Sequence, residues 1–111
     1  MKNFKINIFN TEYSVTFEDK ADFEEADFEE ADFTLGTGDT INKKIQLTRY
    51  LPNGNEISKE ETIETLLHEV IHVILDEGMY REESNSEPMV EWLTKCLYDL
   101  IIKQKLFDKV K

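Results

Sequence analysis

The chain has 111 residues, of which 40% are hydrophobic, a size and composition that fit one globular domain with its own core. Its 24 acidic side chains outnumber its 13 basic ones and give a net charge of −11, which disfavours binding to nucleic-acid phosphates. Because no apolar run approaches the ~20 residues that span a bilayer, and residues 1–10 lack the apolar core of a signal peptide, we expect one cytoplasmic domain over residues 1–111 without membrane partners.

The N-terminal segment shows the alternation of a β-hairpin. Apolar and polar residues alternate over residues 4–9 and again over residues 13–17, and Asn10-Thr11 interrupts the pattern. Such alternation on both sides of a short polar break predicts two antiparallel strands with one face buried.

Residues 18–32 carry nine acidic side chains and one lysine, and within them the sequence Ala-Asp-Phe-Glu-Glu is repeated. A five-residue spacing of Phe fits neither a helix nor a strand, which predicts a solvated loop inserted into the domain. An alternative is that this acidic and aromatic segment binds a basic partner or a cation. The repeat lacks the Gly-containing pattern of an EF-hand loop, so calcium binding is a weak hypothesis.

The next segments predict a turn at residues 36–39, a strand over residues 40–50 and a loop at residues 52–55, where Pro and Gly flank Asn. Ser58 with Glu61 forms a capping-box pattern, which predicts a helix over residues 59–77. Gly78 is the expected stop of this helix. Apolar residues cover most of its circumference, so we expect it to be central and largely buried.

A polar turn is expected at residues 81–86, and a second helix at residues 87–107, because Glu87-Pro88 suits a first helical turn. Cys96 falls among the apolar positions of this helix, and we interpret it as a small buried hydrophobic residue. As the only cysteine, it excludes an internal disulfide framework and a cysteine-based zinc finger.

The candidate chemistry lies in the first helix, where His68-Glu69-Val70-Ile71-His72 forms an H-E-x-x-H motif. Side chains four residues apart lie on one helix face, so the two imidazoles can bind one zinc ion. Glu69 is then placed to act as the general base that takes a proton from the attacking water. The motif predicts His68 and His72 as zinc ligands and Glu69 as the catalytic residue.

The competing interpretation is that both histidines are ordinary core residues with satisfied hydrogen bonds. They are the only two histidines in the chain, and random placement produces this motif roughly once in 400 such sequences. Two histidines and a glutamate on an apolar helix would also be costly to desolvate without a partner. Both arguments favour the metal site.

A catalytic zinc site needs a third protein ligand, which must here be a carboxylate because no further His or Cys cluster exists. Asp76 lies two helical turns from His68, about 11–12 Å, which is too far to share one ion. Glu82 and Glu83 lie in the predicted turn. Glu87 and Glu91 lie one turn apart on the second helix, and the spacing leaves both open.

Residues Thr65–Leu75 together with Glu87–Leu93 resemble the small zincin-like metallopeptidases of phages and prophages, relatives of the ImmA/IrrE-type peptidases. In that family a Glu at the start of the helix after H-E-x-x-H is the third ligand, which implies Glu87 rather than Glu91. The resemblance also implies an α+β, minimal zincin-like fold. In such a fold a small antiparallel N-terminal sheet packs on the active-site helix and a second helix lies at the C-terminal end. The acidic repeat has no counterpart in the family pattern.

We therefore expect a zinc-dependent hydrolase, a metallopeptidase that cleaves a protein or peptide. The alternative is a non-catalytic zinc-binding interaction or accessory protein of a phage-like gene set. Tyr98 lies two helical turns after Glu91 and is a weak candidate for stabilising the oxyanion; Tyr80 and Arg81 are weaker ones. The oligomeric state is left open by the sequence.

Overall fold

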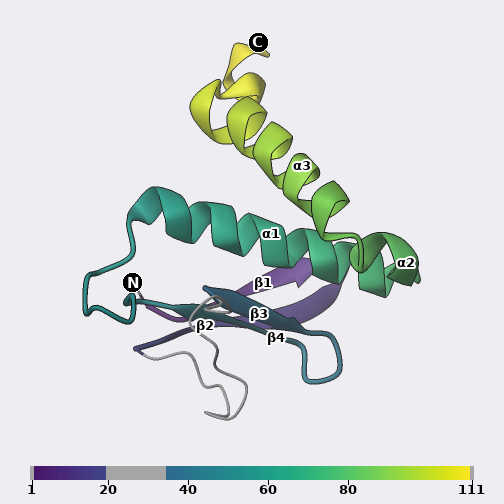
Figure 1. Ribbon diagram of the computed structural model, residues 1–111. Helices are drawn as coiled ribbons and strands as arrows, with labels where there is room; N and C mark the ends of the chain where they lie inside the picture. Colours follow the sequence, from purple (N-terminus) through teal and green to yellow (C-terminus); the bar gives the residue numbers. More distant parts are fainter. Residues whose placement is uncertain (1, 20–34, 111) are drawn as a thin grey trace.

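The computed structural model describes residues 2–19 and 35–110, and the chain folds there as an α+β structure (Figure 1). One four-stranded mixed sheet has the strand order β1-β2-β4-β3, and α1 lies across one of its faces. Most of the acidic repeat, residues 20–32, falls outside the described residues, so its predicted loop stays a prediction. The elements are β1 (Phe4–Ile8), β2 (Thr11–Glu18), β3 (Gly36–Asp39), β4 (Lys44–Thr48), α1 (Lys59–Glu77), α2 (Arg81–Ser84) and α3 (Glu87–Leu97).

The predicted N-terminal hairpin is confirmed as β1 and β2, which pair antiparallel from Phe4↔Val15 to Ile8↔Thr11. The tight turn between them holds Phe9 and Asn10 at positive φ, and Phe9 is 96% exposed. The alternation buries one face of β2 fully, whereas the side chains of β1 are exposed or half-buried. The strand β1 lies at the edge of the sheet away from β4 and β3, the strands that α1 mainly contacts, so the helix leaves its side chains less covered.

The prediction of a turn at residues 36–39 is wrong, because these residues form β3, which pairs antiparallel with β4. The turn lies after β3, where the Asp39 carboxylate accepts hydrogen bonds from the backbone N–H groups of Ile41 and Asn42. The strand predicted over residues 40–50 accordingly shrinks to β4. The strand β3 runs so close to α1 that position 36 has no room for a side chain. A Cβ added at Gly36 would lie 2.9 Å from Cγ2 of Thr65.

The expected small antiparallel sheet is also wrong in its pairing, because β2 and β4 run parallel from Ser14↔Lys44 to Glu18↔Thr48. The sheet has four strands rather than three, and β3 takes the edge position beside β4. The chain enters the edge strand β3, turns back into the antiparallel strand β4, and β4 then runs parallel to β2. Sequence alternation cannot reveal this, since it gives the buried face of a strand but not its neighbour.

The core lies between the sheet and α1. Alternate residues of the two central strands point to the helix, and a valine of α1 packs against them. These contacts bury apolar area and fix the orientation of α1 on the sheet. The buried members are Tyr13, Val15, Phe17, Ile45, Leu47 and Val73, with Ile6, Ile8, Leu66 and Val70 packed around them.

Both ends of α1, Lys59 and Glu77, follow the prediction, but the left-handed residue after the helix lies one position later than expected. Ser58 is the N-cap, and its hydroxyl accepts a hydrogen bond from the N–H of Glu61 at 3.1 Å. Gly78 closes the helix with φ −81°, and the left-handed residue is Met79 with φ 66°. Gly78 is therefore not the left-handed stop that its residue type indicates.

The expectation that α1 is largely buried is wrong. Four of its residues are buried, namely Thr62, Glu69, Ile71 and Val73, while Ile74 is 50% exposed. The reason is the course of α3, which rises away from α1 and the sheet instead of lying along the helix (Figure 1). The first turns of α3 contact the middle of α1, where Glu87 and Glu91 meet the two histidines.

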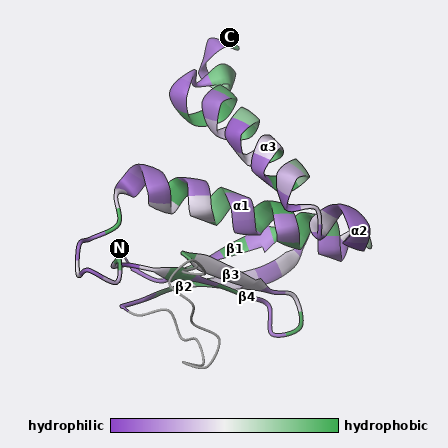
Figure 2. Ribbon diagram, viewed as in Figure 1, coloured by the Kyte–Doolittle hydropathy of each residue, from purple (hydrophilic) through white to green (hydrophobic). Residues whose placement is uncertain are grey.

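The second helix begins at Glu87 as predicted, but its α-helical part ends at Leu97 rather than near Phe107. A π-helical segment, Tyr98–Lys103, and a 3₁₀ turn, Leu106–Lys109, follow it, separated near Lys105 at φ 49°. Cys96 is half-buried rather than buried, and it is a free thiol. Figure 2 shows apolar residues on this projecting arm, far from the sheet. Its exposed apolar residues are Leu100, Ile101, Ile102, Leu106, Phe107 and Val110. Within residues 2–19 and 35–110, no helix combines the length and the apolarity needed to cross a membrane.

Candidate metal centre

The imidazoles of His68 and His72 lie on the face of α1 that meets the first turns of α3. Their spacing of four residues places them one above the other, and each side chain is 18% exposed. The first turn of α3 brings the carboxylate of Glu87 against both rings. Pro88 in that first turn suits a helix that begins at Glu87, immediately beside the histidines.

Three ligand atoms converge at this point. The Nε2 atoms of His68 and His72 lie 3.2 Å apart. The Glu87 carboxylate lies 3.2 Å from Nε2 of His68 through Oε2 and 2.8 Å from Nε2 of His72 through Oε1. Ligand atoms of the three residues all lie within 4.8 Å of one another, a group that could hold one metal ion.

The outer ring nitrogens have their own partners. Nδ1 of His68 lies 3.1 Å from Oε1 of Glu91, and Nδ1 of His72 lies 3.1 Å from Oγ of Ser84. The Ser84 hydroxyl is 3.3 Å from the carbonyl oxygen of His72, to which it donates. A ring that donates from Nδ1 to one of these partners turns the lone pair of its Nε2 towards the Glu87 carboxylate, as a metal ligand requires.

Glu69 is buried, with 8% of the residue exposed, although it carries a carboxylate. Its Oε2 is buried and finds no hydrogen-bond partner within the described part of the chain. Burial, and in second place the negative charge of Glu87, raises the pKa of the Glu69 carboxyl from 4.5 to about 7. A buried acidic group without a partner is costly and is typical of functional sites.

These residues line a pocket of about 580 Å³ between α1 and α3, closed on one side by Leu35 and Gly36 at the start of β3. The pocket contains His68, Glu69, His72 and Glu87 together. One face of α1 therefore supplies the histidines and the buried carboxylate, α3 supplies the third carboxylate, and the edge of the sheet supplies the wall.

The remaining predicted residues do not lie at the point where the two Nε2 atoms and the Glu87 carboxylate meet. Glu91, the alternative third ligand, lies on the outer nitrogen of His68 and not between the two Nε2 atoms. Glu82 and Glu83 belong to α2, the short helix that replaces the predicted turn, and do not line the pocket. Tyr98 does not line it either: the side chain is buried, with Nζ of Lys103 lying 5.8 Å from its ring centroid. Tyr80 and Arg81 also lie outside the pocket lining.

Sequence reasoning missed Ser84, Glu61 and Glu64. The contact of Ser84 with His72 depends on α2, a helix of four residues that is too short to produce a periodic pattern. Glu61 was interpreted as a capping residue, yet its side chain makes no hydrogen bond back to Ser58 and lines the pocket with Glu64. The spacing of Glu61 and Glu64 relative to His68, seven and four residues, was the available signal, because it places them on the same helix face.

Comparison of the chain with models of protein families, with curated proteins and with solved structures finds no match in any of the three. The chemistry of the site must therefore be argued from its own side chains.

Proposed function

We propose that this chain is a zinc-dependent hydrolase, a metallopeptidase that acts on a protein or peptide. The observation that carries the proposal is the convergence of the Nε2 atoms of His68 and His72 with the carboxylate of Glu87, while Nδ1 of each ring has a partner of its own. A cation bound between these three groups would be attracted by the negative charge of the Glu87 carboxylate. Two nitrogens and one oxygen are also a ligand set of catalytic zinc, which leaves one position open.

The buried carboxylate gives the site its chemical capability. When bound by His68, His72 and Glu87, zinc would supply a Lewis acid and lower the pKa of water. Glu69, one residue after His68, would accept a proton from the water that attacks the peptide carbonyl and then donate it to the leaving amine. In the metal-free chain burial raises the pKa of this carboxyl to about 7, and a carboxyl in such surroundings is suited to take up a proton and return it.

The proposal includes the zincin-like classification of the fold, the prophage-type relationship and a cytoplasmic location. Its support is the resemblance of residues 65–75 and 87–93 to those peptidases, together with a sheet that packs on the motif helix. The alternative is a zinc-binding accessory protein without turnover. The buried Glu69 favours the enzyme, since a carboxylate without a partner has no evident use in a purely structural zinc site.

Zinc dependence tests the proposal. We expect the chain to bind one zinc ion, to hydrolyse fluorogenic peptides with zinc, to lose activity with a chelator and to regain it when zinc is restored. Metal content is measured by mass spectrometry on the protein used for the assay. A chain that binds no zinc would contradict the metal centre. A zinc-loaded chain that hydrolyses no peptide would contradict the hydrolase and favour the accessory protein.

The outer partners of the histidines give a second prediction. Glu91→Ala removes the acceptor of the His68 Nδ1–H group, and we expect it to weaken zinc binding about 10- to 100-fold. Glu91→Gln keeps an acceptor and should lose less. Competition with a chromophoric chelator measures the affinity. Equal affinities in wild type and Glu91→Ala would show that Glu91 does not position the ligand.

A further inference from the structure

We propose that the site takes a cationic substrate, a peptide with a lysine or arginine side chain that lies against Glu61 and Glu64. This inference rests on the proposed function and names its substrate class. It concerns the part of the pocket that the metal centre does not use.

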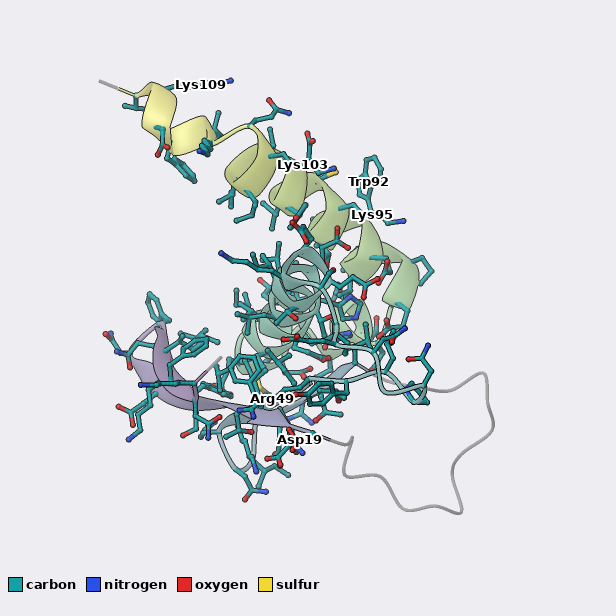
Figure 3. The ribbon with its side chains drawn as sticks, turned by 90° about the vertical axis from the view of Figure 1, so that its left-hand side faces the viewer. Asp19, Arg49, Trp92, Lys95, Lys103 and Lys109 are labelled. Carbon is teal, nitrogen blue, oxygen red and sulfur yellow. The ribbon has the colours of Figure 1, made fainter. Side chains whose placement is uncertain are left out.

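The pocket lining is strongly acidic. Lys95 is the one basic residue among those that line the pocket, and five of the lining residues are glutamates. Lys95 and its neighbour Trp92 extend from α3 in Figure 3, and Trp92 points away from α1. A concave surface with one sign of charge concentrates its field and attracts ligands of the opposite sign. The carboxylates belong to Glu61, Glu64, Glu69, Glu87 and Glu91.

Three of these carboxylates already have a role, and two do not. Glu87 lies between the histidines, Glu91 holds His68, and Glu69 is the buried acid. The carboxylates of Glu61 and Glu64 form no ion pair or hydrogen bond with any residue in the described ranges. Both are exposed, and both belong to the face of α1 that continues from His68 towards the helix start.

An independent observation indicates that this pocket is built for a ligand. Glu69 lines the same pocket, is more than nine-tenths buried and leaves its Oε2 without a partner. A protein that desolvates a carboxylate in this way keeps it for something that enters the pocket. Glu61 and Glu64 line the same pocket, so a ligand that enters it would lie beside their carboxylates.

Distance along the helix sets where the basic side chain must sit. With a rise of 1.5 Å per residue, Glu64 and Glu61 lie about 6 Å and about 10 Å from His68 along the axis of α1. An extended peptide advances about 3.4 Å per residue. The lysine or arginine is therefore expected within about two or three residues of the bond that is cleaved.

Paired peptide libraries test the inference. Fluorogenic peptides carry lysine, or its uncharged analogue norleucine, at each position within three residues of the cleaved bond. We expect lysine at one position to raise kcat/KM about tenfold over norleucine at low salt. The double variant Glu61→Gln/Glu64→Gln should bring this ratio close to one, with about two- to fivefold lost for each carboxylate.

Two variants serve as controls. Glu60→Gln removes the same charge from the same turn of α1, but Glu60 does not line the pocket, so the lysine preference should persist. Lys95→Gln removes the competing ammonium group and should increase the preference. A norleucine peptide cleaved as well as its lysine partner, or a preference that survives in the double variant, would overturn the inference.

Failure of the proposed function can be recognised separately. If no peptide is cleaved by the zinc-loaded chain, the same lysine and norleucine peptides are titrated into it by calorimetry. Tighter binding of the lysine peptide that disappears in Glu61→Gln/Glu64→Gln supports the acidic subsite without hydrolysis. Equal binding of the two peptides overturns it.

Discussion

Replacing Glu69 by Gln is expected to lower kcat/KM for peptide hydrolysis by about 10²- to 10⁴-fold, the usual contribution of a general base. Gln has nearly the same shape as Glu but cannot accept and return a proton. His68, His72 and Glu87 stay intact in this variant, so zinc should still bind at one ion per chain. The measurement pairs steady-state kinetics with metal analysis of the same sample.

The control for this variant is Glu82→Gln, which removes a carboxylate from an exposed position of α2 outside the pocket. Its activity should equal that of the wild type. If Glu69→Gln hydrolysed peptides at the wild-type rate, Glu69 would not be the base. If it lost zinc together with activity, Glu69 would belong to the metal ligands instead.

The second large effect is expected in the stability of the metal-free protein. The Glu69 carboxyl has a pKa of about 7 in the folded chain against an ordinary 4.5, so between these values the folded state holds a proton that the unfolded state has lost. The free energy of unfolding therefore falls as pH rises through this window and levels off above pH 7. The loss amounts to about 3 kcal/mol at pH 8.

Gln at position 69 does not titrate, so Glu69→Gln should escape this loss. We expect the difference in unfolding free energy, variant minus wild type, to grow by about 3 kcal/mol from pH 4.5 to pH 8 in the presence of chelator. Urea denaturation at several pH values measures it, and Glu82→Gln should differ from wild type by a constant amount. A difference for Glu69→Gln that stays constant with pH would show that Glu69 is not desolvated.

The helical half of the site could be predicted because its geometry is local. A spacing of four residues places His68 and His72 on one face of any α-helix, and Ser58 marked the start of that helix correctly. The start of α3 at Glu87 was also readable, since Pro88 is favourable in a first turn. These predictions needed no knowledge of which elements pack together.

The sheet was predicted less well, because its pairing depends on residues far apart in the sequence. Gly36 and Gly38 gave a genuine turn signal, yet pairing with β4 and close approach to α1 make them a strand. The parallel pairing of β2 with β4 was likewise invisible, since the alternation of Tyr13, Val15 and Phe17 is the same for either direction of the neighbouring strand.

The spacing of Glu87 and Glu91 could not predict which of the two is the third ligand. Both residues lie on one face of α3, and both contact His68, but they contact different ring nitrogens. Spacing places a carboxylate near an imidazole without deciding whether it meets Nε2 or Nδ1. That decision depends on how α3 crosses α1, which the packing of the two helices determines.

A crystal structure of the zinc-loaded chain, with anomalous scattering recorded at the zinc edge, would locate the ion relative to the two histidines. We expect one peak at about 2.0–2.1 Å from Nε2 of His68 and Nε2 of His72, and about 2.0–2.2 Å from the Glu87 carboxylate. The Glu69 carboxylate should face the open position without bonding to the ion. A crystal without such a peak, or one whose zinc lies away from these two rings, would show that His68 and His72 do not form a zinc site.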